Sequence, residues 1–333
     1  MRSREPMKLL HLVLAACVVL AASCIENPQA HPPAARYKAP RAKDARKGRT
    51  AVTVPGLPSN GTHGSPSQLS GPPPPPGFPN ASTTGVPAGT TLQRAGPQIV
   101  TENGVVLDSL DIEGGVIVKA SNVVIRRCRI TDPNDQVVKM SETVQNLRIE
   151  DSELDGLGTA LVGIGGGGSF AAERVNLHGS VDGVRAASGM VLLDSYIHDL
   201  VRAADKHNDG AQASGPAKNI VIRHNSILNP NHENSGIYLS SHYGPIDGVT
   251  IDNNFLDGGG RTVYVLDKGS GFGTPTNVSV MNNRFGRDFN RALGYGKFFQ
   301  SGNAWADNGS PIADITTVQR DPGRQGNQSS SGN

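Results

Sequence analysis

The stretch KHNDGAQAS, residues 206–214, concentrates side chains that could do chemistry. It holds an ammonium at Lys206, an imidazole at His207 and a carboxylate at Asp209 within four residues. Such groups can neutralise negative charge and move protons, which is what general acid–base catalysis requires. Asp-Gly is also common turn chemistry, so Asp209 could instead simply begin a strand. The choice between the two depends on the elements that surround the stretch.

Those elements belong to a repeat. An apolar residue, a small or amide residue three positions later and an apolar residue two positions after that recur along the chain. The intervals between copies run from 20 to 30 residues, and the first apolar residues are Ile125, Ile149, Ala172, Leu192, Ile222, Ile251 and Val280. Self-similarity at such a period indicates a solenoid, and this period suits one coil of parallel strands.

A second segment in each repeat alternates with period two, as a half-buried strand does. One apolar position is occupied by Val138, Val162, Val184, Ala211, Ile237 and Val263, and the next by Met140, Ile164, Ala186, Ala213, Leu239 and Val265. We expect both positions to face the core. The residues between them are expected to face outward, and they are Lys139, Gly163, Arg185, Gln212, Tyr238 and Tyr264.

A third pattern is an amide ladder. Asn225, Asn254 and Asn283 recur at 29-residue spacing, and earlier copies have Ser195, Ser152 and Cys128 there. Stacked amides can hydrogen-bond along a solenoid axis and satisfy backbone groups. Cys128 lies between apolar positions and is expected to be a small buried hydrophobe, not a nucleophile and not half of a disulfide.

The repeated N-x-x-I-x-x-N-x-I/F phrase and the ladder, over residues 90–305, resemble the parallel β-helix superfamily typified by pectate lyases. The resemblance implies an all-β fold, a right-handed single-stranded parallel β-helix solenoid. It also implies a secreted protein with a polysaccharide site in a groove on the outer face of a sheet. The W-x-D-H and R-x-P-x-x-R segments of pectate lyases are absent, as are the N-T-D, G-H-G and R-I-K segments of polygalacturonases. The resemblance therefore indicates the fold and leaves the reaction open.

The outward positions and the loops beside them form one polar and aromatic strip. Neighbouring coils are about 4.8 Å apart, so the strip from Arg185 to Tyr264 would span several sugar units. The predicted catalytic residues are His207, Asp209, Arg185, Lys206 and Glu233. The predicted substrate-binding residues are Gln212, Tyr238, Tyr264, Lys139, His232 and His242.

Two reactions suit this strip. In a lyase acting on a uronic polymer, Arg185 or Lys206 would neutralise the sugar carboxylate, His207 would be the base and Tyr238 the acid. A glycoside hydrolase needs two carboxyl groups, and the options are Asp182, Asp209, Asp205 and Glu233.

The alternative to both reactions is a non-catalytic surface protein, an adhesin or scaffold that binds glycans through its tyrosines. We predict no cofactor. A Ca²⁺ site at His207, Asp209, His232 and Glu233 is conceivable, but the spacing of these residues matches no established metal site.

The N-terminus predicts export. Arg2, Arg4 and Lys8 precede an apolar run that ends in small residues, which is typical of a signal peptide over residues 1–24. Cys24 suits lipidation, so the expected location is secreted or in the cell envelope with a possible lipid anchor. The alternative is ordinary cleavage and free secretion.

Residues 25–84 are rich in Lys, Arg and Pro and are predicted to be a disordered linker. A β-helix domain over 85–315 and a disordered tail over 316–333 follow. Residues 1–50 carry ten Lys and Arg against three Asp and Glu, so residues 51–333 have a net charge of −5 although the whole chain has +2. A net negative charge of this kind argues against a nucleic-acid partner. We expect a monomer whose partner is a polysaccharide.

Overall fold

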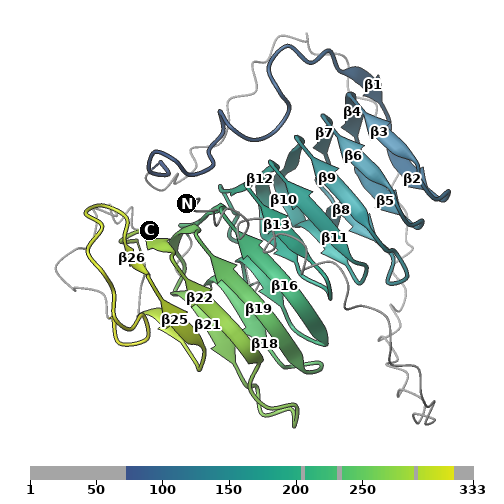
Figure 1. Ribbon diagram of the computed structural model, residues 1–333. Coiled ribbons are helices and arrows are strands. Elements are labelled where there is room, and N and C mark those ends of the chain that lie inside the picture. Colours follow the sequence, from purple (N-terminus) through teal and green to yellow (C-terminus); the bar gives the residue numbers. More distant parts are fainter. Residues whose placement is uncertain (1–72, 204–206, 231–234, 289–291, 319–333) are drawn as a thin grey trace, which may run out of the picture. The chain divides into compact units, whose positions relative to one another are not determined.

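The computed structural model describes residues 73–203, 207–230, 235–288 and 292–318. Within these ranges the chain forms strands, turns and bends and contains no helix. Accordingly, no described helix is long and apolar enough to cross a membrane. All pairings between the named strands are parallel, and every strand between the first and last coils pairs with strands of the coils before and after it, so the fold is an all-β parallel β-helix (Figure 1).

The first face of the solenoid is a nine-stranded ladder. Its strands follow one another in the order β3 (Val106–Asp108), β6 (Val124–Arg126), β9 (Leu147–Glu150), β11 (Phe170–Glu173), β13 (Val191–Leu193), β16 (Ala217–Arg223), β19 (Ile246–Asp252), β22 (Thr276–Met281) and β25 (Phe299–Ser301).

The other strands form a 17-stranded sheet that consists of two ladders. One contains β1 (Gln93–Ala95), β4 (Leu110–Glu113), β7 (Arg129–Thr131), β10 (Glu153–Gly166), β12 (Asn176–Arg185), β14 (Tyr196–Ile197), β17 (Ser226–Asn229), β20 (Phe255–Gly258), β23 (Arg284–Phe285) and β26 (Ala304–Trp305). The other, here called the groove ladder, contains β2 (Gln98–Val100), β5 (Val116–Val118), β8 (Gln136–Met140), β15 (Asp209–Ala213), β18 (Ser235–Ser240), β21 (Arg261–Leu266) and β24 (Ala292–Tyr295). The long strands β10 and β12 take part in both ladders.

The predicted repeat matches the strand register. The first apolar residues of the copies pair in an unbroken column, Ile125–Ile149–Ala172–Leu192–Ile222–Ile251–Val280. The buried apolar side chains of all three ladders join one core cluster, in which isoleucine, valine and leucine predominate. Burial of this aliphatic surface is the main force that holds the coils together.

The amide ladder is also present as predicted. The backbone N–H of Asn225 donates to Asn254 Oδ1 at 2.9 Å, and that of Asn254 donates to Asn283 Oδ1 at 2.9 Å. Asn303 extends the ladder by one coil. Cys128 stands in the same position, is fully buried and unpaired, and burial raises the pKa of its thiol. The prediction that it is a small buried hydrophobe is therefore confirmed.

The predicted register was wrong in one coil. Ile164, rather than Val162, pairs with Val138 and Val184, so Gly165 occupies the outward position that had been given to Gly163. The reason is an irregularity in β10 between Asp155 and Ala160, which shifts the register after that point. Val162 and Ile164 are two positions apart and both apolar, so either one satisfies the period-two pattern and the sequence does not distinguish the two registers.

Residues 73–92, here called the strap, lead into β1 and lie against the solenoid (Figure 1). The N–H of Gly85 donates to Arg174 O at 2.9 Å, and the Phe78 ring packs against the rings of His224 and Phe255. The prediction had placed residues up to 84 in the linker, because a segment so rich in proline has little apolar surface to bury. In the structure the described contacts begin before that boundary.

Candidate functional site

The outward column of the groove ladder is present as predicted from Arg185 to Tyr264. Arg185 pairs with Gln212, Gln212 with Tyr238, and Tyr238 with Tyr264. The column continues to Tyr295 on β24, a residue that the sequence analysis did not include. One polar or aromatic side chain thus stands on each successive coil, on the same face.

Two hollows adjoin this column. The first, here the glycine pocket, measures about 470 Å³, and its described lining is Glu142, Gly166, Gly167, Arg185, Ala186, Ala187, Ser188, Gln212, Ser214, Gly215 and Pro216. The second, here the tyrosine pocket, measures about 450 Å³, and its described lining is Arg185, Gln212, Ser214, Tyr238, His242, Tyr243 and Lys268. Because the pockets share Arg185, Gln212 and Ser214, they form one groove.

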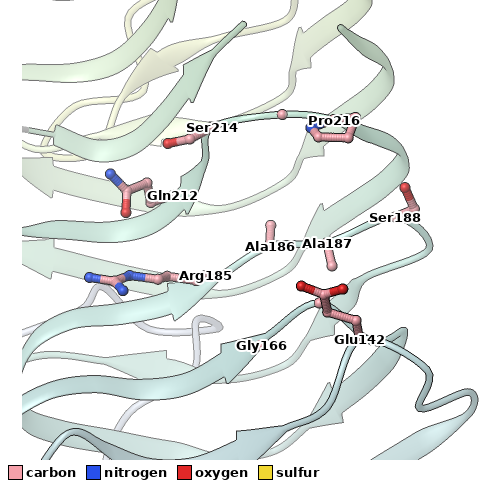
Figure 2. Close-up of a pocket in the computed structure, with 11 residues that line it drawn as sticks. Glu142, Gly166, Arg185, Ala186, Ala187, Ser188, Gln212, Ser214 and Pro216 are labelled. Atoms are coloured by element: carbon pink, nitrogen blue, oxygen red, sulfur yellow. The ribbon is translucent and has the colours of Figure 1, made fainter. Parts of the chain in front are cut away.

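The backbone that lines the glycine pocket requires glycine at one position. Gly166 ends β10 with a φ of +128°, and a Cβ there would lie 2.0 Å from the carbonyl oxygen of Met140. Only glycine fits at that position without displacing backbone. Figure 2 shows Arg185 and Gln212 projecting on the same side of neighbouring strands, with the Glu142 carboxylate across the hollow.

Arg185 is held in place from below. Its Nε and Nη2 donate to Asp182 Oδ2 at 3.1 and 2.9 Å, and Asp182 is only 3% exposed while the Arg185 side chain is 46% exposed. Burial raises the pKa of Asp182, and the nearby Arg185 opposes that rise. Two donors that converge on one carboxylate oxygen hold the guanidinium in place and leave its outer part facing the groove.

Asp209 lies beneath the groove and does not line it. It is 1% exposed, it accepts the N–H of Ser235 at 3.0 Å, and its own N–H donates to Asp182 Oδ1 at 3.1 Å. Burial, together with the charge of Asp182, raises its pKa well above the usual value. A carboxyl group so enclosed cannot touch a polymer in the groove, so we do not retain the catalytic role predicted for it. The alternative interpretation, a residue that begins a strand, agrees with its place at the start of β15.

The other predicted residues divide into three groups. Tyr238 and His242 line the tyrosine pocket, whereas His207, Lys139 and Tyr264 are not among the described lining residues of either pocket. Lys139 instead pairs with Asp135 at 3.0 Å. The remaining residues, Lys206, His232, Glu233, Asp205 and the lipidation candidate Cys24, lie outside the described residues.

Several groove residues were missed by the sequence analysis. Glu142 and Lys268 come from turns that follow strands of the groove ladder, where the repeat pattern sets no expectation. Tyr243, which the sequence places beside His242 in the SSHYGP loop, does line the tyrosine pocket. From Tyr238 in the tyrosine pocket, an aromatic row continues along the solenoid: Tyr238, Tyr264 and Tyr295 stack edge to face with ring centres 5.6 and 5.0 Å apart. Arg261 lies over the last two rings at 5.0 and 4.8 Å.

A second polar cluster, here called the histidine cluster, lies on the ladder that contains β10, β12 and β14. His178 Nε2 is 3.1 Å from Glu153 Oε1, and His198 Nδ1 is 2.8 Å from Asp199 Oδ2. The two imidazoles stack at 5.1 Å, and Tyr196 stacks on His198 at 4.0 Å. The hydrogen bond from His178 lowers the pKa of Glu153. The sequence analysis did not single out these residues. His198 and Asp199 are neighbours in the chain, but Glu153 and His178 are 25 positions apart and meet only because the coils stack.

Among the residues that the structure describes, no group of three or more His, Cys, Asp and Glu side chains is arranged to hold a metal ion. The Ca²⁺ site considered from the sequence needs His232 and Glu233, which lie outside the described ranges, so that idea stays a prediction.

No family model matches the chain, and no curated protein matches it. Among solved structures, the chain is similar to the catalytic unit of a thermostable GH87 alpha-1,3-glucanase from Streptomyces thermodiastaticus strain HF3-3. The identity is 14% over 68% of this chain, with a TM-score of 0.32, and the match spans about half (52%) of the length of that catalytic unit. A likeness so distant carries no functional argument, and the site is interpreted from its own residues.

Proposed function

We propose that this protein binds an anionic, uronate-containing polysaccharide in the groove and cleaves it by β-elimination. The observation that supports the proposal best is the composition of the tyrosine pocket. Its described lining offers a guanidinium, an ammonium, an imidazole and two phenols, and it contains no carboxylate. A cationic and aromatic lining of this kind attracts a negatively charged polymer and stacks on its sugar rings.

The proposed step assigns a role to each kind of group. Arg185 and Lys268 neutralise the sugar carboxylate, which acidifies the proton on the neighbouring C5 carbon. His242 removes that proton, and the electron pair left behind forms the C4–C5 double bond. The C4–O bond breaks, and the Tyr238 hydroxyl gives its proton to the leaving oxygen. His242 takes the role of base that the sequence analysis gave to His207, because His242 lines the same pocket as Tyr238.

Hydrolysis is less well supported by the groove. A glycoside hydrolase needs two carboxyl groups on either side of the bond that breaks. Among the described lining residues of both pockets, Glu142 is the single carboxylate, and Asp182 and Asp209 are buried below the groove floor. A second exposed carboxylate from Asp205 or Glu233 would be required.

A non-catalytic glycan-binding protein is the second candidate. The observation in its favour is the tyrosine strip, which extends from Tyr238 to Tyr295, beyond the residues that could carry out the elimination. Binding requires only such stacking surfaces, and it would tolerate loss of proton-transferring groups. Export by a signal peptide over residues 1–24, with or without a lipid on Cys24, is part of both proposals, since a polysaccharide of this kind lies outside the cell.

Product analysis separates the three functions. The full chain is incubated with uronic and neutral polysaccharides, while reducing ends and the ultraviolet absorbance of unsaturated sugars are followed together. Reducing ends that appear with that absorbance on a uronic polymer are the expected result. Reducing ends without that absorbance would mean hydrolysis. Binding of the polymer without any new reducing ends would mean that the protein is a non-catalytic glycan-binding protein.

A further inference from the structure

We infer that Glu142 makes the glycine pocket a subsite for a sugar without a carboxyl group, so that the groove selects a mixed polysaccharide in which a uronate is linked to a neutral or amino sugar. The inference rests on the proposed function, because it takes from there the binding of a uronate by Arg185 and Lys268. It adds the chemical class of the neighbouring sugar and the residue that selects it.

The two pockets of the groove differ in charge outside the residues that they share. With histidine taken as neutral, the charged group that belongs only to the tyrosine pocket is Lys268, and the charged group that belongs only to the glycine pocket is Glu142, among the described lining residues. The described lining of the glycine pocket also contains no aromatic side chain. A polymer that lies along the groove therefore meets two different electrostatic environments.

The neighbouring coil holds Glu142 at the groove. Four consecutive glycines, residues 165–168, end β10 and begin the turn after it. A Cβ on Gly167 would lie 2.7 Å from Glu142 Cγ, and one on Gly168 would lie 2.7 Å from the carbonyl oxygen of Val144. The turn after β10 therefore lies directly against the turn after β8, and the stem of Glu142 packs on its backbone.

The carboxylate of Glu142 is available to a ligand. Figure 2 shows it across the hollow from Arg185. Within the described part of the chain, no hydrogen bond or ion pair joins it to another protein group. Arg185, by contrast, already has Asp182 as its partner. Glu142 thus faces the pocket with both oxygens free to accept hydrogen bonds.

Glu142 and Lys268 lie on opposite sides of Arg185 along the solenoid axis. In the groove ladder β8 precedes β12 by two coils, and β21 follows β12 by three. At about 4.8 Å per coil, the turn that carries Glu142 is about 10 Å from Arg185 in one direction, and the turn that carries Lys268 is about 14 Å away in the other. A uronate bound between Arg185 and Lys268 therefore directs the adjoining part of the polymer toward Glu142.

The glycine pocket suits a sugar that donates hydrogen bonds. A carboxylate only accepts them, and a sugar hydroxyl or ammonium group can supply them. Ser188 Oγ accepts the N–H of Lys218 at 3.2 Å, so its own proton is left for a sugar oxygen. A second uronate would instead bring another negatively charged acceptor to Glu142. Such a like-charge contact lowers affinity and so selects against a polymer with a carboxylate on every sugar.

Three polymers of equal length test this inference. They are a homopolyuronate, an alternating polymer of uronate and neutral hexose, and an alternating polymer of uronate and a hexosamine with a free amino group. Calorimetry measures the affinity of the full chain for each at one salt concentration. The measurements use a Tyr238→Phe background, which keeps the stacking ring but lacks the hydroxyl that would protonate the leaving oxygen. Attraction by positive charge alone would favour the homopolyuronate, whereas we expect the mixed polymers to bind about tenfold more tightly.

Glu142→Gln is the decisive variant, and Glu102→Gln is its matched control. Val100, Val118 and Met140 pair in one column, so Glu102 occupies the same turn position as Glu142 two coils earlier, outside the described lining of both pockets. Glu142→Gln should bind the homopolyuronate about tenfold more tightly and thus lose the preference for mixed polymers. A gain in affinity cannot come from damage to the fold. Glu102→Gln should keep the wild-type preference.

The outcomes separate this inference from the proposed function. A preference for either mixed polymer supports the inference, and a stronger preference for the amino polymer that Glu142→Gln removes would identify an ammonium group as the partner. Equal or tighter wild-type binding of the homopolyuronate would overturn the inference alone, as would a preference that survives in Glu142→Gln or is lost equally in Glu102→Gln. If none of the polymers bound more tightly than its carboxyl-reduced form, the proposed function would fail, and the inference with it.

Discussion

The groove and the histidine cluster are both collections of polar side chains on the outer faces of consecutive coils, but they differ in how their groups are satisfied. In the histidine cluster, His178 faces Glu153 and Asp155, and His198 faces Asp199 and Asn176. In the groove, Arg185 is held by one buried carboxylate while its outer part faces a hollow of several hundred cubic ångströms. The comparison teaches that a cluster of titratable residues suggests a site only where it meets open space.

Of the substitutions considered, replacing Arg185 should have the largest effect on activity. A small effect would mean that the groove is no more a functional site than the histidine cluster. Arg185→Ala removes the cation that both pockets share, and we expect kcat/KM on a uronic polymer to fall by about 10²- to 10³-fold. The variant should also lose stability, because the buried Asp182 is left without its partner, so activity is compared on folded protein. Lys139→Ala is the matched control, because Lys139 is a cation in the same outward column that lies outside the described lining of both pockets. Equal losses in the two variants would mean that the column, not the groove, provides the positive charge.

Asp257 sharpens the comparison, because it occupies the strand position of His198 two coils further on, and no cation is among the described groups that shift its pKa. Burial raises its pKa to about 7, and its Oδ2 has no hydrogen-bond partner in the described structure. The unfolded carboxyl group titrates near pH 4, so the free energy of unfolding should fall by on the order of 4 kcal/mol as the pH rises from about 4 through 7.

Asp257→Asn should remove most of that fall. We expect urea denaturation to find the variant more stable than the wild type at pH 8, by on the order of 1–3 kcal/mol, and no more stable at pH 4.5. The same stability difference at both pH values would show that Asp257 does not carry the buried proton.

His178→Asn should act on stability alone. Burial opposes a charge on His178, but the hydrogen bond to Glu153 and the charge of Asp155 outweigh it and raise the pKa of His178. A raised histidine pKa contributes stability that is complete below about pH 6.5 and is lost as the pH rises through the value in the folded state. Thermal or urea unfolding should therefore show a loss of about 1–2 kcal/mol at pH 6 and a smaller loss at pH 8.5. Weaker polysaccharide binding in this variant would make the histidine cluster part of the site.

Tyr295→Ala should have the smallest effect and would delimit the groove. Tyr295 is 45% exposed at the end of the tyrosine strip, two coils beyond Tyr238. We expect the affinity for a long polymer, measured by calorimetry, to fall about three- to tenfold, because one stacking surface is lost. Short oligosaccharides that fill only the tyrosine pocket should bind the variant as tightly as the wild type, and an equal loss for both would argue against a bound chain that runs along the solenoid.

Much of the fold could be predicted from the sequence because every coil of a solenoid repeats the same pattern of inward and outward residues. The column from Ile125 to Val280 and the ladder of Asn225, Asn254 and Asn283 follow from period and residue type alone. The register of β10 could not be predicted, since the irregularity after Asp155 has no signal in the alternation of apolar residues.

The site was predicted only where it follows the repeat. Arg185, Gln212 and Tyr238 occupy a periodic strand position, so their convergence could be read from spacing. Glu142 and Lys268 come from turns of variable length, and turns carry no period that would place them. Burial was the other missing quantity, because an Asp-Gly pair looks the same in sequence whether its carboxylate faces the groove or, as at Asp209, lies beneath it.

The central claim, that the groove recognises the carboxylates of an acidic polysaccharide, is tested most directly by a pair of matched ligands. One is a polyuronate and the other is the same polymer with its carboxyl groups reduced to alcohols, and calorimetry measures the affinity of the full chain for both at one salt concentration. The account predicts binding at least about 100-fold tighter to the polyuronate, with that preference lost when Arg185 and Lys268 are both replaced by alanine. Equal affinity for the two polymers, or a preference that survives in the double variant, would contradict it.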